Sequence, residues 1–365
     1  MIHRSPLSHL VLGSLVLVTL AGRPVAAHEQ APPPATRAVT EIASGVYVIQ
    51  HPLSGWVESN TVVVIGDRDV LVVDTGFTSA SACEDIADIK KWTNKPIRYV
   101  VNTHWHEDHT AGNIDYQRAF PGVAIIAHPS TAMMLAKMSP SLASGINRDA
   151  PPYKKSIEDR LASGKAANGQ PLTDAQRASL NRQLSDIAKV MTQATEYQQA
   201  MPTLTIKGQM TVDLGNRVVD ITHAGRGNTA GDLVVYLPKE RIVATGDLLV
   251  SPTPFTFDGY PTEWIQTLKA IRQWPTDITV PGHGNVMRDH DYLDKVVTLM
   301  QNVIDQVDAQ LIKNPEATFD DVKKAVDLTA MKTLFGATDA YNGGNFDLSI
   351  KDHLIEIVFH ELKQR

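Results

Sequence analysis

Short apolar runs alternate with amphipathic stretches along most of the chain. Runs rich in valine and isoleucine, bounded by Gly, Pro, Asn or Asp, are typical of buried β-strands. They predict strands over residues 46–50, 61–65, 70–73, 99–102, 123–127, 211–214, 218–222, 233–237 and 242–245. Apolar residues at helical spacing predict helices over 79–92, 262–274 and 289–313. The pattern predicts a mixed α/β domain with one large core.

Residues 130–200 lack the short apolar runs of the strands and are predicted to form a helical insertion. Prolines at 140, 151 and 152 are expected to divide it into several helices. Thr173 followed by Gln176 is a capping-box pattern, which predicts that the longest helix begins there. An apolar stripe then runs from Leu180 to Met191 and predicts packing on the sandwich, with a mobile lid over the site as the alternative.

The sequence His-Trp-His-Glu-Asp-His at residues 104–109 places four metal-capable side chains within six positions. A β-type stretch leads directly into it, so His104 and His106 are expected to point to the same side of an extended backbone. The following turn would direct Asp108 and His109 toward a second position nearby. Neutral imidazoles and carboxylates are ligands that suit Zn²⁺. The motif therefore predicts a zinc site.

Three other apolar runs also end in a metal-capable side chain. A buried carboxylate is costly unless it is paired or metal-bound, so these strand ends are expected to meet at a common centre. Each residue taken alone is equally compatible with an ordinary turn. The runs and their end residues are 71–73 with Asp74, 242–245 with Asp247, and 278–280 with His283.

These motifs, in this order, resemble those of the metallo-β-lactamase superfamily, over about residues 45–286. The resemblance implies a four-layer αββα sandwich with one or two zinc ions at one edge of the two sheets. The implied ligands are His104 and His106 for the first ion, Asp108, His109 and His283 for the second, and Asp247 as a bridge. Asp74 would orient the ligand loop, and both Asp74 and Asp108 are predicted to be catalytic.

The third motif departs from the family pattern. Where the family usually has histidine, this chain has Asn228, in the sequence Gly-Arg-Gly-Asn-Thr. An amide oxygen is a weaker zinc donor than imidazole, which predicts a weak first position or a site with one tightly held ion. His223, at the end of the 218–222 strand, is the alternative ligand.

The N-terminal segment predicts export. Arg4, an apolar run over residues 10–20 and small residues up to Ala27 are typical of a secretory signal peptide over residues 1–27. A flexible lead-in is predicted for 28–40, the metallo-β-lactamase-fold domain for 41–313, and a helical extension for 314–365, which would pack on the outside or on a second subunit. The expected location is the periplasm or the exterior, with no stable membrane anchor after cleavage. The single Cys83 cannot form an intramolecular disulfide and is expected to be in the core.

The formal net charge of −6, without a basic run, argues against a nucleic-acid partner. A small molecule is the expected partner, and Trp56, Phe255 and Phe257 are candidate pocket residues, with core packing as the alternative. The predicted activity is the opening of a cyclic amide or ester, such as a β-lactam or lactone, by a metal-bound hydroxide. The alternatives are a thioester hydrolase, a non-catalytic metal-binding protein, or a di-iron oxygen or nitric oxide reductase. In the reductase branch a glutamate replaces His106.

Overall fold

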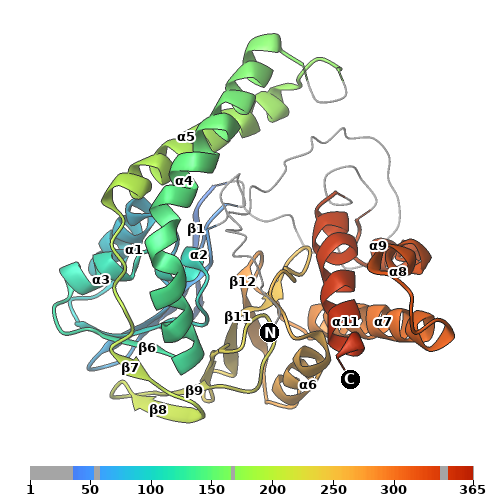
Figure 1. Ribbon diagram of the computed structural model, residues 1–365. Coiled ribbons are helices and arrows are strands. Elements are labelled where there is room, and N and C mark those ends of the chain that lie inside the picture. Colours follow the sequence, from blue (N-terminus) through green and yellow to red (C-terminus); the bar gives the residue numbers. More distant parts are fainter. Residues whose placement is uncertain (1–35, 53–57, 166–168, 338–343, 365) are drawn as a thin grey trace.

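The computed structural model describes residues 36–52, 58–165, 169–337 and 344–364, which form two β-sheets with helices outside them (Figure 1). Strands β1 to β4 pair antiparallel, and β4 to β7 pair parallel. Among the described residues, the first sheet has the order β1 (Ala38–Ala43), β2 (Val46–Gln50), β3 (Thr61–Ile65), β4 (Val70–Val73), β5 (Ile97–Val101), β6 (Ala124–Ala127) and β7 (Leu204–Thr205).

The second sheet is mostly antiparallel, with one parallel pair formed by β11 and β12. β12 ends at His283, and β11 carries Asp247 near its carboxyl end. The parallel pairing directs both carboxyl ends to the same edge of the sheet. The order is β12 (Ile278–His283), β11 (Ile242–Val250), β10 (Val234–Leu237), β9 (Val218–Thr222) and β8 (Gln209–Asp213).

Side chains that alternate along each strand divide the interior into three layers of core. On β4, Val72 packs toward helices α1 (Ser79–Trp92) and α3 (Asn113–Ala119), whereas Leu71 packs between the two sheets. On β11, Val243 faces helices α6 (Pro261–Ile271) and α7 (Asp291–Lys313). Helix, sheet, sheet and helix therefore follow one another, which confirms the predicted αββα sandwich.

The strand predictions were accurate where the apolar runs were long, and the strands β2, β3, β4 and β9 begin and end at the predicted residues. The strand β1 was not predicted and begins inside the range 28–40 that was assigned to a flexible lead-in. Its burial is shallow, so the apolar pattern is weak there. The two-residue strand β7 was also missed.

The insertion consists of two long helices, α4 (Pro129–Ser163) and α5 (Asp174–Glu196), that project from the sandwich (Figure 1). The expectation that the prolines would divide this segment was wrong, because α4 continues through Pro140, Pro151 and Pro152. An interior proline costs about 3 kcal/mol, and here the packing of the helix pair offsets that cost. The capping box of Thr173 and Gln176 is confirmed. The stripe on α5 packs mainly on α4, with Phe77 of the sandwich at one end of the contact.

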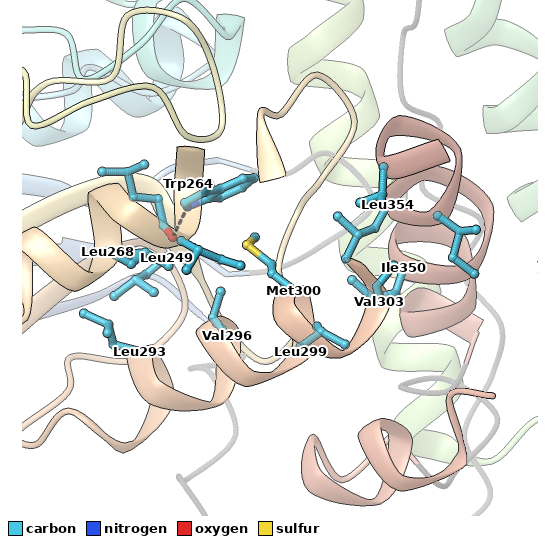
Figure 2. Close-up of a cluster of buried hydrophobic side chains, with 14 of the residues drawn as sticks. Leu249, Trp264, Leu268, Leu293, Val296, Leu299, Met300, Val303, Ile350 and Leu354 are labelled. Atoms are coloured by element: carbon cyan, nitrogen blue, oxygen red, sulfur yellow. Dashed lines mark hydrogen bonds between the residues drawn. The ribbon is translucent and has the colours of Figure 1, made fainter. Parts of the chain in front are cut away.

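The C-terminal extension packs against the outer helices of the second sheet. It contains α8 (Phe319–Ala325), α9 (Thr329–Leu334), a π-helix η1 (Asp347–Leu354) and α11 (Ile355–Lys363). Ile350 and Leu354 are fully buried in the same cluster as Val303 of α7 and Trp264 of α6 (Figure 2). The extension is therefore part of the main core.

Three further predictions concern Cys83, membrane-spanning helices and the residues outside the described ranges. Cys83 is exposed rather than in the core, because it lies on the outer face of α1. No helix among the described residues is both long and apolar enough to cross a bilayer. The signal-peptide residues 1–27, lead-in residues up to 35, and the pocket candidate Trp56 lie outside the described residues.

Candidate metal centre

The loop after β5 carries the His-Trp-His-Glu-Asp-His motif and is held against the end of β4. The backbone oxygen of His109 accepts hydrogen bonds from the Thr75 N–H at 3.0 Å and from Asn102 Nδ2 at 3.2 Å. Position 112 accepts only glycine, because a Cβ at this position would lie 2.1 Å from the Thr75 backbone oxygen. The short helix α2 (Glu107–Thr110) then turns Asp108 and His109 away from the strand direction.

Asp74 fixes the orientation of this loop. Its Oδ1 accepts from the Thr103 N–H at 2.8 Å, and its Oδ2 accepts from Thr103 Oγ1 at 2.8 Å and from His109 Nδ1 at 2.7 Å. The residue has a φ of 59°, a left-handed conformation in which Asp is among the residues best tolerated. These contacts agree with the predicted orienting role.

Three strand ends meet around His109. Its Nε2 lies 3.3 Å from His283 Nε2, 3.4 Å from Asp108 Oδ2 and 3.2 Å from Asp247 Oδ1. Asp247 Oδ2 lies 3.7 Å from His104 Nε2, so its two oxygens face different histidines. The resulting groups with metal-ligand spacing are His104, His109 and Asp247, and Asp108, His109 and His283.

The fourth histidine, His106, belongs to neither of these two groups, but its Nδ1 is 2.8 Å from His104 Nε2. Two nitrogens that bind one tetrahedral zinc at 2.0–2.1 Å are about 3.4 Å apart, so a small ring movement would suffice. The structure thus brings together the six predicted His and Asp ligands. Their assignment to individual ions stays a prediction.

Each histidine of the cluster directs one nitrogen outward to an oxygen acceptor. His109 Nδ1 donates to Asp74, and His283 Nδ1 donates to the backbone oxygen of Glu58 at 3.0 Å. His104 Nδ1 is 3.0 Å from Thr103 Oγ1, whose proton is directed to Asp74, and His106 Nε2 is 3.5 Å from Asp258 Oδ2. The inward nitrogens are therefore the ones that would bind a metal ion, once any proton they carry has left.

The electrostatics of the cluster also fit a bound cation. Burial lowers the pKa of His104 well below its ordinary value, and the neighbouring histidines add to this effect. Burial opposes protonation of His109, yet Asp108 and Asp247 raise its pKa well above the ordinary value. Burial opposes ionisation of Asp108, but His109 and His283 hold its pKa well below the usual range. The buried carboxylates need positive charge beside them, and a divalent metal bound here would supply it in place of the proton on His109.

Asn228 is a buried polar side chain in the loop between β9 and β10. It is 0% exposed, and neither its Oδ1 nor its Nδ2 has a hydrogen-bond partner among the described residues. Hydrogen bonds hold the loop around it, since Asp232 accepts from the Gly227 N–H at 3.1 Å and the Thr229 N–H at 2.9 Å. A buried amide normally finds partners, and the unpaired Oδ1 is compatible with the ligand role of Asn228, which stays a prediction.

His223, the alternative ligand, makes its two described contacts with residues outside the group of six predicted ligands. Its Nδ1 contacts the backbone oxygen of Asp232 at 2.9 Å, and its ring stacks on His128 with centroids 4.4 Å apart. Of the two pocket candidates that the structure describes, Phe255 contacts the cluster directly and Phe257 lies behind it. The Phe255 ring is edge-on to His106, with centroids 5.9 Å apart, and it contacts Phe257.

Sequence reasoning missed four residues that support the cluster. Thr103 connects His104 to Asp74, and Glu58 accepts from His283 through its backbone. Burial raises the pKa of Asp232, which holds the Asn228 loop, to about 7. Asp258 faces His106 from a loop eleven residues after Asp247. Only Thr103 had a sequence signal, since it directly precedes the first histidine.

We expect Asp258→Asn to weaken zinc binding about tenfold, because the carboxylate orients the His106 ring and increases its basicity. Zinc titration of the metal-free protein by calorimetry measures this change. Asp277→Asn, which removes a carboxylate from an exposed pair with Arg241, is the matched control and should change nothing. Unaltered zinc affinity in Asp258→Asn would remove Asp258 from the site.

Comparison with known proteins agrees with the geometry. The sequence profile of the metallo-β-lactamase superfamily matches residues 54–283, more than half of the chain. A linear primary-alkylsulfatase of a Pseudomonas species is 23% identical over 271 residues, which are 71% of this chain and 48% of that protein. The α subunit of a 2,4-dinitroanisole O-demethylase of a Nocardioides species is 24% identical over 61% of this chain and 52% of that protein. The chain thus spans about half the length of these relatives.

The solved structures show the same fold. A metallo-β-lactamase from Pontibacter korlensis superimposes with a TM-score of 0.52 at 22% identity, over 73% of this chain and 100% of the other. The DIM-1 metallo-β-lactamase superimposes with a TM-score of 0.50 at 18% identity, over 73% of this chain and 97% of the other. From its motifs, its four-layer fold and the matched profile, the chain belongs to the metallo-β-lactamase superfamily, whose members are metal-dependent hydrolases.

Proposed function

We propose that this protein is an exported, zinc-dependent hydrolase that cleaves an ester or amide bond, with cyclic substrates such as lactones and β-lactams as the first candidates. The observation that carries the proposal is the pair of ligand groups that share His109 and are joined by Asp247. Such a site fits one or two ions. The export part rests on the sequence of residues 1–27 alone.

Zinc bound here would acidify a water molecule and polarise the carbonyl group that is attacked. Asp108 is suited to orient that water, because it is ionised and its side chain is 21% exposed, whereas the histidines around it are buried. Asp247 would hold the two metal positions at a fixed distance, because its two oxygens face His104 and His109. Asp74, Thr103 and Glu58 keep the inward nitrogens of the ligand histidines aimed at the centre.

The relatives widen the set of bonds that a test must include. One is named a primary-alkylsulfatase, and short matches include a metallo-β-lactamase type 2 of Bacillus cereus and an atrochrysone carboxyl ACP thioesterase of Passalora fulva. All three names fit attack of water on a carbonyl carbon or a sulfate ester. A second candidate, hydrolysis of a sulfate ester, is favoured by the alkylsulfatase match over 71% of this chain.

The test is turnover by the zinc-loaded protein of four substrates in parallel: a chromogenic cephalosporin, a lactone, a thioester and a primary alkyl sulfate. We expect turnover of the cyclic ester or amide, and loss of that turnover after removal of zinc. Turnover of the alkyl sulfate alone would replace the first candidate with the second. Absence of turnover for every substrate, in protein that holds zinc, would support a non-catalytic role instead.

A further inference from the structure

A row of rings extends from the metal cluster to the C-terminal extension. Phe255 is edge-on to His106, and Phe255 and Phe257 are tilted against each other with centroids 4.2 Å apart. Phe257 then contacts the ring of His353 at a centroid distance of 4.0 Å. His353 belongs to the π-helix η1, nearly 100 residues away in the chain, so the wall beside the metal cluster is assembled from two distant segments.

The extension holds this wall firmly. Thr256, between the two phenylalanines and fully buried, donates to the backbone oxygen of Ser349 at 2.6 Å. Ser349 Oγ in turn donates to the backbone oxygen of Pro254. Ile350 and Leu354 of the same helix are buried in the core against α7 (Figure 2). π-Helices are rare and occur frequently at functional sites.

Exposure distinguishes this wall from ordinary core packing. Phe255, Phe257 and His353 are all half-buried, so each ring keeps a part of its surface accessible. The rings that serve the core alone behave differently, since Trp264 and Phe346 are 1% and 0% exposed. Partly accessible aromatic rings beside metal-capable side chains are a common lining of a substrate subsite.

We propose that Phe255, Phe257 and His353 form a specificity wall for substrates that carry a planar aromatic group near the bond to be cleaved, and that His353 is a specificity-determining residue. A planar ring adds one more edge-to-face or offset contact to the row, whereas a small alkyl group gains no such contact. This inference rests on the proposed function and names the substrate class of that site.

The first measurement is binding, which needs no turnover. Calorimetry of the zinc-loaded protein gives the dissociation constants of phenylacetate and of acetate, which share a carboxylate and differ in the ring. We expect His353→Ala and Phe257→Leu to raise the dissociation constant of phenylacetate about three- to tenfold and to leave that of acetate unchanged. His353→Phe retains the ring contact and should retain phenylacetate binding.

The matched control is His360→Ala, because His360 is an exposed histidine of the same extension that contacts Phe359 and not the wall. It should alter neither dissociation constant. The second measurement compares phenyl acetate with methyl acetate as substrates. For each ester, the kinetic constants of the variant are divided by those of the wild type, so that the different intrinsic reactivities of the two esters cancel. We expect KM to rise for phenyl acetate only, with kcat nearly unchanged.

The inference would be overturned if His353→Ala lost affinity equally for phenylacetate and acetate, or lost affinity for neither. Failure of the wild-type protein to prefer phenylacetate over acetate would also overturn it. If phenylacetate binding depends on His353 but neither ester is hydrolysed, the specificity wall stands and the proposed hydrolase activity toward such esters is what fails.

Discussion

Replacement of Asp108 by Asn is expected to lower kcat by about 10²-fold or more while the fold remains intact. The amide retains the shape of the side chain but removes the charge that lies 3.0 Å from His283 Nε2 and 3.4 Å from His109 Nε2. The variant therefore keeps one acceptor oxygen but loses the negative charge with which Asp108 would bind the metal and orient the attacking water. Steady-state kinetics on whichever substrate the zinc-loaded wild type turns over measures the effect.

The thermal unfolding midpoint of Asp108→Asn in the metal-free state serves as the folding check and should stay near that of the wild type. Asp294→Asn, which removes a carboxylate from the exposed pair with Arg272, is the control for a generic charge change. An Asp108→Asn enzyme with unimpaired kcat would rule out the role given to this residue.

Zinc titration of the metal-free protein is expected to show two unequal steps, and Asn228→His should strengthen the weaker one by about 10- to 100-fold. The weak step belongs to the position that would have His104, His106 and one neutral amide oxygen. The buried, unpartnered amide of Asn228 is the physical reason to place it there. A third imidazole would provide a stronger donor in the same place.

His223→Ala is the control for this titration. Because His223 is stacked on His128 and bonded to the Asp232 backbone, its loss should leave both zinc affinities nearly unchanged. Two equally tight steps in the wild type, together with no response to Asn228→His, would show that Asn228 is not a ligand.

The parts of the site that were predictable from sequence share one property: they lie at the ends of apolar strands. Asp74 and His104 follow buried strands, His283 ends β12, and Asp247 ends the predicted run 242–245, although β11 continues to Val250. Parallel strands bring such positions to one edge of a sheet. The apolar pattern of each run therefore also indicated where in the fold its site residue would lie. The ligand geometry around each residue was not predictable, because it depends on turns such as α2.

What sequence reasoning missed depends on contacts between distant segments. Asp258 and His353 carry no motif, and their positions next to His106 and Phe257 result from loop and helix packing in the folded chain. The continuity of α4 through Pro140 is a similar case, since packing against α5 outweighs a local preference. Cys83 was misplaced because it was judged by residue type, whereas the periodicity of Ala82, Ile86 and Ile89 puts the buried face of α1 beside it.

The most direct test of the metal-hydrolase account is stepwise reconstitution of the metal-free protein with zinc, with bound metal, unfolding midpoint and turnover followed in the same samples. The account predicts no turnover without metal, a midpoint that rises as the His and Asp cluster is filled, and turnover that increases in proportion to bound zinc up to two equivalents. Full turnover and an unchanged midpoint in protein that contains no metal would contradict it.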